Sequence, residues 1–311
     1  MGADDFMVTV PFIPFILHSF SALERSCCPA YDFCMSDPNV RPKIVGVVNI
    51  TADSFSDGGL YLEPKRAIAH ARDLVSQGAD IVELGAASSN PDAVHVGADE
   101  EIARLGPVLD ELQPGGHILA VDTTKPEVQK FVLERGIAFL NDIRGFLDNA
   151  VHEQIARSSC RLVVMHSITG GHQARRLATN PQEIYEAACR FFRSRLDQLS
   201  SAGIAVERII LDPGMGFFLG SNPETSLAML AKLKSLRMQF GQPLLVSVSR
   251  KSFLRNLPPA GDCDIQSRTL AAELYAAAQG VEYIRTHDAR ALSQALSTAA
   301  AIARADSLVS L

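Results

Sequence analysis

The sequence has no run of basic residues of the kind that follows a nucleic-acid backbone. Its 29 Lys and Arg residues are outnumbered by 35 Asp and Glu residues, and the formal net charge is −6. Because proteins that bind nucleic acids neutralise phosphates with clustered cationic side chains, we do not expect a nucleic-acid partner.

Cysteine is also sparse, and its spacing follows no known pattern. The 6 cysteines lie at positions 27, 28, 34, 160, 189 and 263. They show neither the paired spacing of a zinc site nor the density of a small disulfide-bonded domain. We interpret them as reduced thiols, which predicts a cytoplasmic protein.

An uninterrupted apolar run of membrane-spanning length is absent as well. The longest apolar stretch, residues 6–17, is broken by Pro11 and Pro14, and Asp4 and Asp5 precede it where a secretory signal carries positive charge. We therefore expect neither a signal peptide nor a membrane partner. Residues 1–42 show no clear periodicity, and we interpret them as an irregular extension that is either disordered or the result of a mis-called start.

From residue 43 onward the chain repeats one pattern. A short apolar run rich in β-branched residues is followed by a polar or glycine-containing turn and then by an amphipathic stretch of helical period. The helical period is clearest at residues 64–77 and 126–135. The predicted strands number eight and cover residues 43–50, 80–85, 117–122, 139–143, 161–167, 209–214, 243–249 and 283–288.

Parallel strands that each precede a helix can close into a ring, which leaves no exposed sheet edge. The main competitor is the doubly wound open sheet, which usually carries GxGxxG in the turn after its first strand. Residues 49–59 here read NITADSFSDGG, which lacks that spacing. The sequence therefore predicts an α/β fold, a single-domain (β/α)8 TIM barrel over residues 43–311.

Polar residues gather at the ends of seven predicted strands. They are Asn49, Asp122, Asn141, Asp142, His166, Ser167, Asp212, Ser249, Arg250, Lys251, Arg285, His287 and Asp288. Any one of these carboxylates could simply cap the next helix, and a lone histidine is more often a satisfied structural residue. Independent caps are a poor explanation for so many at the same end of a barrel, so we predict one site there.

The carboxylates and amide of this site suggest a heterocyclic ligand. Asp122 and Asp212, together with Asn141, offer paired donors and acceptors. Such groups suit the edge of an amino-pyrimidinone ring, whose N–H groups need acceptors.

The cationic residues suggest an anionic group on the same ligand. Lys251, Arg285 and His287 supply positive charge and hydrogen-bond donors, which fits diphosphate. Asn49 is a neutral oxygen ligand of the kind that Mg²⁺ accepts, and an ordinary turn residue would look the same.

Five motifs at these positions carry a family resemblance: VVNITADSFSDGG at residues 47–59, NDI at 141–143, LDPGMG at 211–216, SRKS at 249–252 and RTHD at 285–288. Together they resemble dihydropteroate synthase, and the likeness covers the whole predicted barrel. The resemblance implies a TIM-barrel transferase of folate biosynthesis. Such an enzyme condenses 6-hydroxymethyl-7,8-dihydropterin diphosphate with 4-aminobenzoate, usually as a homodimer with Mg²⁺.

The resemblance also implies roles for individual residues. The residues implied for pterin binding are Asp122, Asn141, Met165, Asp212 and Lys251. The residues implied for diphosphate binding are Asn49, Arg285 and His287, and Asn49 is also the implied metal ligand.

A loop at residues 51–59 is implied to close over the site. Its Asp53 and Asp57 join Lys251 and Arg285 as the implied catalytic residues. The residues implied for the arylamine pocket are Phe55, Ser89, Pro91, Phe217, Phe218 and Ser249.

Two segments depart from the family pattern. After the second strand the family usually reads GESTRPG, whereas residues 85–92 read GAASSNPD, so that Asn90 stands in place of an arginine. After the sixth strand, GMGFFL at residues 214–219 places Phe218 and Leu219 where the family often has glycine and lysine. We expect one cation fewer near the anionic substrates and a bulkier, less polar arylamine pocket.

These departures, with Ser167 after His166 and PETS at residues 223–226, resemble the horizontally acquired, sulfonamide-insensitive branch of the family. A sulfonamide carries a sulfonyl group and a substituent where 4-aminobenzoate has a flat carboxylate. Added side chains at that end could therefore obstruct the drug and spare the smaller substrate.

A second interpretation is a pterin-binding module such as the methyltetrahydrofolate domain of corrinoid methyltransferases. That module shares the barrel and its Asp and Asn contacts to pterin, and it breaks no C–O bond. The loop at residues 51–59 and the SRKS motif are not part of that resemblance. A plain phosphate-binding metabolic barrel and a scaffolding role are further alternatives.

Overall fold

The computed structural model describes residues 41–51, 61–258 and 264–309. The extension expected at residues 1–42 lies almost entirely outside these ranges. The implied closing loop, with Asp53, Phe55 and Asp57, also lies outside the described residues. Both stay predictions.

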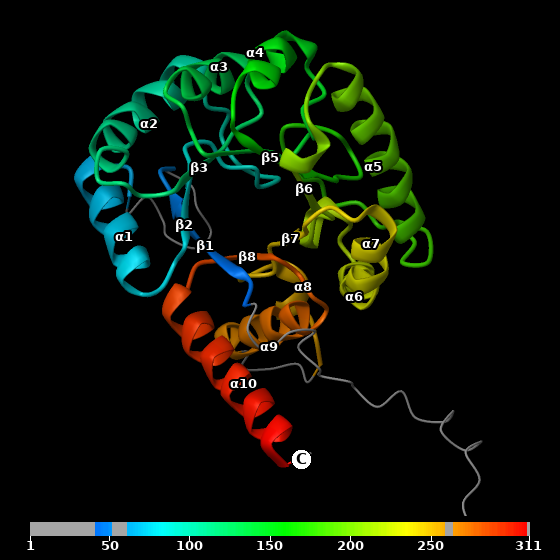
Figure 1. Ribbon diagram of the computed structural model, residues 1–311. Coiled ribbons are helices and arrows are strands. Elements are labelled where there is room, and N and C mark those ends of the chain that lie inside the picture. Colours follow the sequence, from blue (N-terminus) through cyan, green and yellow to red (C-terminus); the bar gives the residue numbers. More distant parts are fainter. Residues whose placement is uncertain (1–40, 52–60, 259–263, 310–311) are drawn as a thin grey trace, which may run out of the picture. The chain divides into compact units, whose positions relative to one another are not determined.

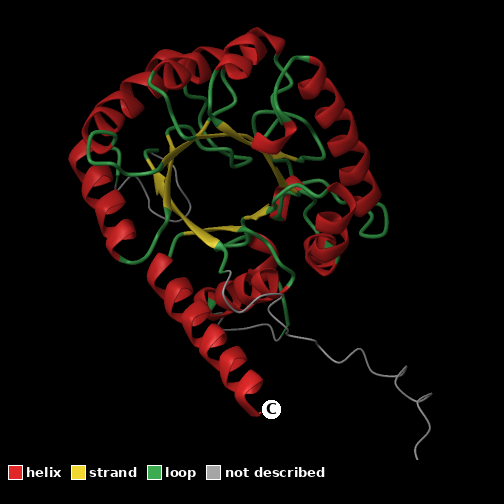
Figure 2. Ribbon diagram, in the orientation of Figure 1, coloured by secondary structure: helices red, strands yellow, loops and turns green. Residues whose placement is uncertain are grey.

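The strands form one parallel sheet whose order is β6-β5-β4-β3-β2-β1-β8-β7. An isolated bridge between Leu211 and Leu244 joins the two end strands, so the sheet closes into a ring. The predicted (β/α)8 barrel is therefore confirmed, as Figures 1 and 2 show. The strands are β1 (Lys43–Asn49), β2 (Ile81–Gly85), β3 (Leu119–Asp122), β4 (Phe139–Asp142), β5 (Arg161–Met165), β6 (Ile209–Asp212), β7 (Leu245–Val246) and β8 (Tyr283–Thr286).

Helices surround the ring of strands on its outer side (Figure 2). Within the described ranges, none of them is long and apolar enough to cross a membrane. The helices are α1 (Pro64–Ser76), α2 (Ala98–Leu112), α3 (Pro126–Glu134), α4 (His152–Arg157), α5 (Ile184–Ser201), α6 (Pro223–Ala231), α7 (Leu233–Phe240), α8 (Ser252–Arg255), α9 (Ile265–Ala278) and α10 (Ala289–Val309). Three short 3₁₀ segments complete the fold: η1 (Asn149–Val151), η2 (Val206–Arg208) and η3 (Gly216–Phe218).

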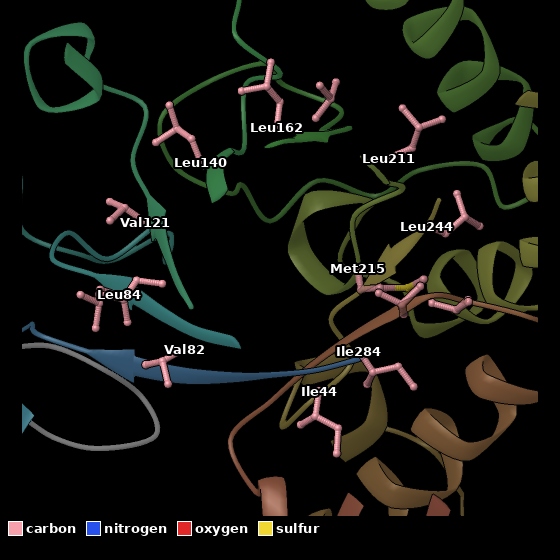
Figure 3. Close-up of a cluster of buried hydrophobic side chains, with 14 of the residues drawn as sticks. Ile44, Val82, Leu84, Val121, Leu140, Leu162, Leu211, Met215, Leu244 and Ile284 are labelled. Carbon is pink, nitrogen blue, oxygen red and sulfur yellow. The ribbon is translucent and has the colours of Figure 1, made fainter. Parts of the chain in front are cut away.

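Successive residues of each strand point alternately toward the helices and toward the barrel axis. The outward-facing set includes Ile44, Val82, Val121, Leu162 and Ile284, and it packs with apolar helix residues into the main core. Figure 3 shows members of this core on strands all around the ring. Burial of this surface is the main source of the barrel's stability.

The inward-facing residues form two layers, which we name by their composition. The apolar inner layer consists of Val45, Ile81, Ala120, Phe139, Val163, Ile210, Leu245 and Tyr283. The residue two positions later on each strand, or just after it, faces the same way and lies nearer the carboxyl end of that strand. These residues form the charged inner layer: Val47, Glu83, Asp122, Asn141, Met165, Asp212, Ser247 and Arg285.

Strand β7 is much shorter than the predicted strand at residues 243–249. After Val246 the chain turns, because the Lys251 amide donates to the Val248 carbonyl oxygen at 3.2 Å. Arg250 takes a left-handed backbone conformation with φ of 58°, which is rare for a side chain of this kind. The turn ends the strand early and changes the direction of the chain just before Lys251.

Candidate active site

The carboxyl ends of the strands surround a cavity of about 360 Å³. The predicted site residues that line it are Asn49, Ser89, Pro91, Asp122, Phe217, Phe218, Ser249, Lys251, Arg285 and His287. They come from strands β1, β3 and β8 and from the segments after β2, β6, β7 and β8. Residues that are far apart in the sequence therefore meet in one cavity because the ring is closed.

Three other predicted residues are missing from the cavity wall. Asn141, Met165 and Asp212 are almost fully buried in the charged inner layer. Met165 packs in a small cluster with Phe218, which itself lines the cavity. Asp212 accepts a hydrogen bond from the Gly214 amide at 2.8 Å, so one of its carboxylate oxygens has a fixed partner.

A buried ion-pair network lies at the centre of the site. The Arg285 Nε donates to Glu83 on β2, and an Arg285 Nη2 atom lies 3.5 Å from the Asp122 carboxylate. Glu83 also accepts from the Asn141 amide nitrogen at 3.2 Å. Since charges are costly to bury unless they are paired, this network holds its members in fixed positions.

Burial shifts the pKa values of the charged groups around the cavity. Burial, together with the neighbouring Glu83 charge, raises the pKa of Asp122 to about 8. It raises the pKa of Asp212 to about 6. Burial and the nearby Arg285 charge lower the pKa of Lys251 to about 8. Such shifts are common where a protein prepares groups to bind or react.

His287 contributes hydrogen-bonding atoms rather than charge. Burial lowers its pKa well below the usual value, and the positive charges of Arg285, Arg250 and Lys251 add to that effect. Its Nδ1 atom lies 2.9 Å from the Ser249 Oγ, and its backbone amide donates to the same oxygen at 3.2 Å. At neutral pH the positive charge around the cavity therefore comes from its lysine and arginine side chains, among them Arg285 and Lys251, and not from His287.

A larger cleft of about 970 Å³ adjoins the cavity. The two share Ser89, Pro91 and Asp122, and the cleft extends toward Thr124 and His172, whose side chains lie 2.6 Å apart. Lys251 and Arg285 line the smaller cavity and do not line the larger cleft. We therefore place the candidate active site in the smaller cavity, in spite of its size.

Comparison with known proteins identifies the family. Residues 45–287 match the family described as pterin binding enzyme. The chain is 53% identical over 259 residues to dihydropteroate synthase type-2 of Escherichia coli, an alignment that covers 83% of this chain and 95% of the relative. The chain belongs to the dihydropteroate synthase family.

Other members of the dihydropteroate synthase family agree with this assignment. Dihydropteroate synthase type-3 of Escherichia coli is 50% identical over 84% of this chain and 99% of its own length. The solved structure of Xanthomonas albilineans dihydropteroate synthase with 4-aminobenzoic acid superimposes with a TM-score of 0.74 at 32% identity, covering 84% of this chain and 93% of that one.

The segment in which family members usually carry an arginine gains a cation from another loop. Arg176, from the loop after β5, lines the cavity and pairs with Asp92, with one N–O distance of 2.8 Å. Its guanidinium also lies over the Phe217 ring, with 5.3 Å between the guanidinium carbon and the ring centroid. Asn90 leaves its own loop without the arginine of the family pattern, and Arg176 supplies a cation to the same cavity from another loop, where it is paired with Asp92.

Phe218, which departs from the dihydropteroate synthase pattern, and its neighbour Phe217 both line the cavity. Phe218 is buried and packs with Ile143 and Met165, while its ring lies 5.0 Å from the Lys251 Nζ. Phe217 packs against the same cluster and is only partly buried. Both therefore fill core space and also form part of the cavity wall.

Sequence reasoning missed Glu83 and Arg176. Glu83 is a lone carboxylate within the apolar strand sequence IVELG, and that interruption was the available signal. Arg176 gave no signal, because its partner Asp92 is 84 positions away and only the fold brings the two loops together.

The side chains around the cavity offer few ligands for magnesium. Among the described residues there is no group of three or more His, Cys, Asp or Glu side chains that could hold a metal ion. Asn49 lines the cavity together with Arg285 and His287. Mg²⁺ often uses one or two protein oxygens and takes its other ligands from substrate phosphates and water, so Asn49 fits a metal of that kind.

Proposed function

We propose that this member of the dihydropteroate synthase family condenses 6-hydroxymethyl-7,8-dihydropterin diphosphate with 4-aminobenzoate. The observation that carries the proposal is the grouping of Asp122, Asn141, Asp212, Lys251 and Arg285 at the carboxyl ends of the strands. These residues place carboxylate and amide groups beside the cations Lys251 and Arg285, and they therefore offer complementary partners to a pterin ring and to an attached diphosphate.

In this proposal the pterin occupies the inner part of the site. The Asn141 Oδ1 atom is buried and has no hydrogen-bond partner among the described residues. A buried acceptor without a partner costs about 1–3 kcal/mol, which a ligand N–H group would recover. Asp212 offers its second carboxylate oxygen, and Lys251 stands at the cavity wall to donate to a ring acceptor.

The diphosphate would then lie beside Arg285, His287 and Asn49. A magnesium ion held there by Asn49 and the phosphates would neutralise negative charge on the leaving diphosphate. The C–O bond to diphosphate breaks with its electron pair on oxygen, and the resulting pterin cation is stabilised by resonance. The arylamine nitrogen donates its lone pair to form the new C–N bond and then releases one proton.

We also propose that the arylamine pocket excludes sulfonamides. Phe217 and Phe218 form part of the cavity wall beside Ser249 and Lys251. Phe218→Gly removes a ring from that wall. It should therefore lower the Ki of a sulfonamide by about tenfold or more and reduce turnover much less. Phe192→Leu, at a buried position outside the cavity, is the matched control for the loss of an aromatic ring. Equal losses of drug resistance and turnover in Phe218→Gly would contradict this role.

The experiment that tests the proposed function is steady-state release of diphosphate from both substrates with Mg²⁺. The same assay is repeated with a sulfonamide in large excess over the arylamine. Turnover that persists under the drug supports both proposals, and turnover that stops keeps the synthase and removes the role of the aromatic wall. Pterin binding without any turnover would favour the corrinoid-type binding module.

We further propose that the working unit is a homodimer. Light scattering on the purified chain measures its mass in solution. A mass of one chain at the concentrations used in the assay would contradict the proposal.

A further inference from the structure

Glu83 is the one charged residue on strand β2, and it lies in the charged inner layer. Its register partners are Val47 on β1 and Ala120 on β3, and only 1% of its surface is exposed. A carboxylate at such a position is unfavourable unless both oxygens have good partners. Its presence therefore calls for an explanation beyond packing.

Both oxygens of Glu83 are used by residues that our proposed function assigns to the substrate. Oε1 accepts from the Arg285 Nε, and Oε2 accepts from the Asn141 Nδ2 at 3.2 Å. Arg285 approaches Asp122 with a different atom, Nη2, at 3.5 Å. A single carboxylate thus connects the implied pterin and diphosphate contacts without lining the cavity itself.

The contact with Asn141 has a consequence for ligand recognition. An amide side chain can present either its oxygen or its nitrogen, and only its partners decide between the two orientations. An ionised carboxylate accepts hydrogen bonds and cannot donate them, so Glu83 requires the Asn141 nitrogen to face it. The Asn141 oxygen is then left as the buried acceptor that has no partner among the described residues.

The contact with Arg285 fixes the cation in the same way. The Arg285 side chain is 16% exposed, and burial alone would lower its pKa. The negative charges of Glu83 and Asp122 outweigh burial and raise the pKa of Arg285. The guanidinium is therefore charged and held between two carboxylates before any diphosphate arrives.

We propose that Glu83 is a positioning residue that sets the Asn141 amide as an acceptor for the pterin and fixes Arg285 for the diphosphate. This inference rests on the proposed function. Because neither contact requires Glu83 to touch the substrate, its effect should appear first in pterin affinity and only then in turnover.

The decisive variant is Glu83→Gln, which keeps the shape of the side chain and removes the charge. A glutamine can donate to the Asn141 oxygen, so the acceptor for the pterin is lost in part of the molecules. We expect the Kd of a pterin without diphosphate, measured by calorimetry, to rise about tenfold to a hundredfold, as when a buried hydrogen-bonding group is left without its partner. Glu83→Asp keeps the charge at a shorter reach and should recover part of the affinity.

The matched control is Glu273→Gln, the same change at a buried carboxylate on α9. It should leave pterin affinity within about twofold, because the hydrogen-bond partner of Glu273 is Thr286, which is none of the proposed pterin contacts. A double-variant cycle then separates positioning from general damage. If Glu83 acts through Asn141, adding Glu83→Gln to Asn141→Ala should weaken pterin binding no further than Asn141→Ala alone, by less than about threefold.

A pH profile of pterin binding gives a readout that a purely structural role would not move. The groups that act on Asp122 are Glu83, Arg285, Asp142 and Glu101. Loss of the Glu83 charge removes one cause that raises the pKa of Asp122, so the limb of the profile that belongs to Asp122 should move to lower pH.

Several results would overturn the inference. Unchanged pterin affinity in Glu83→Gln would do so. So would a double variant in which the losses of affinity caused by Glu83→Gln and Asn141→Ala multiply. If Glu83→Gln does not fold, full wild-type affinity in Glu83→Asp would also contradict it, because the shorter side chain cannot reach both partners. Failure of the wild-type chain to bind any pterin would instead reject the proposed function.

Discussion

On each strand the apolar inner layer and the charged inner layer are only two residues apart. In the first, Val163, Ile210 and Leu245 pack without polar atoms. In the second, Asp212 is buried and Asp122 is mostly buried, and burial raises the pKa of both carboxyl groups. Burial of apolar surface stabilises a fold and burial of charge does not, so stability accounts for the apolar inner layer and does not account for the charged one.

The largest effect on activity is expected from Asp212→Asn in the charged inner layer. The amide can still accept from the Gly214 amide, and it loses the negative charge and one acceptor for the pterin. A hydrogen bond to a charged group contributes about 1.5–3 kcal/mol, so kcat/KM should fall by about one to two orders of magnitude. Steady-state assays of diphosphate release measure this.

The same variant should be more stable than the wild type at pH 8. The pKa of Asp212 is raised to about 6, so ionisation above that pH destabilises the fold, and Asn carries no such charge. Ser247→Ala, in the same layer on the chain after β7, is the control and should change kcat/KM by less than about threefold. Equal losses in both variants would remove the distinction between the residues of this layer.

A smaller effect, on stability alone, is expected in the apolar inner layer. Ile210→Asn places an amide among apolar side chains, where an unpaired polar group costs about 1–3 kcal/mol in addition to the lost packing. The midpoint of thermal unfolding should fall by several degrees, and Ile210→Val should cost only about 1 kcal/mol. An Ile210→Asn enzyme with normal stability and altered pterin affinity would show that the apolar inner layer also contributes to ligand binding.

The last prediction concerns the pH dependence of stability and a buried carboxylate outside both layers, where no effect on the ligand is expected. Burial raises the pKa of Glu273 to about 8, and its Oε1 has no hydrogen-bond partner in the described part of the chain. The folded state therefore holds a proton that the unfolded state releases near its ordinary pKa of about 4.5.

Stability from this group is complete below the unfolded pKa and is lost as the pH rises through about 8. The loss amounts to at most about 1.4 kcal/mol per pH unit in that window. Glu273→Gln should flatten this dependence and be more stable at pH 8, as urea unfolding at several pH values would measure. A slope that stays the same in the variant would assign the pH dependence to another group.

Much of the architecture could be predicted from local pattern. The βα repeat and the polar strand ends are local features, and helix boundaries at Pro64 and Pro126 were predicted correctly. The length of β7 was not, because an apolar alternation continues to residue 249 while the backbone already turns there. A turn that depends on a left-handed arginine leaves no mark in the hydrophobic pattern.

The site could be predicted only where its residues stand at strand ends. Asp122, Lys251 and Arg285 were found in this way, and the structure places them in one cavity. Glu83 lies in mid-strand, where the expected residue is apolar. Arg176 depends on a contact between two loops, and such contacts follow from the closed ring rather than from spacing in the sequence.

The closure of the ring between β6 and β7 has a consequence for how the protein responds to its ligand. The two strands meet through an isolated bridge, with the Leu211 amide donating to the Pro243 carbonyl oxygen at 2.9 Å. Asp212 is the last residue of β6, and Lys251 lies in the segment that follows β7. A pterin bound by both Asp212 and Lys251 would connect β6 to the segment after β7, where few backbone hydrogen bonds connect them. Binding of the substrate would therefore strengthen the closure of the barrel.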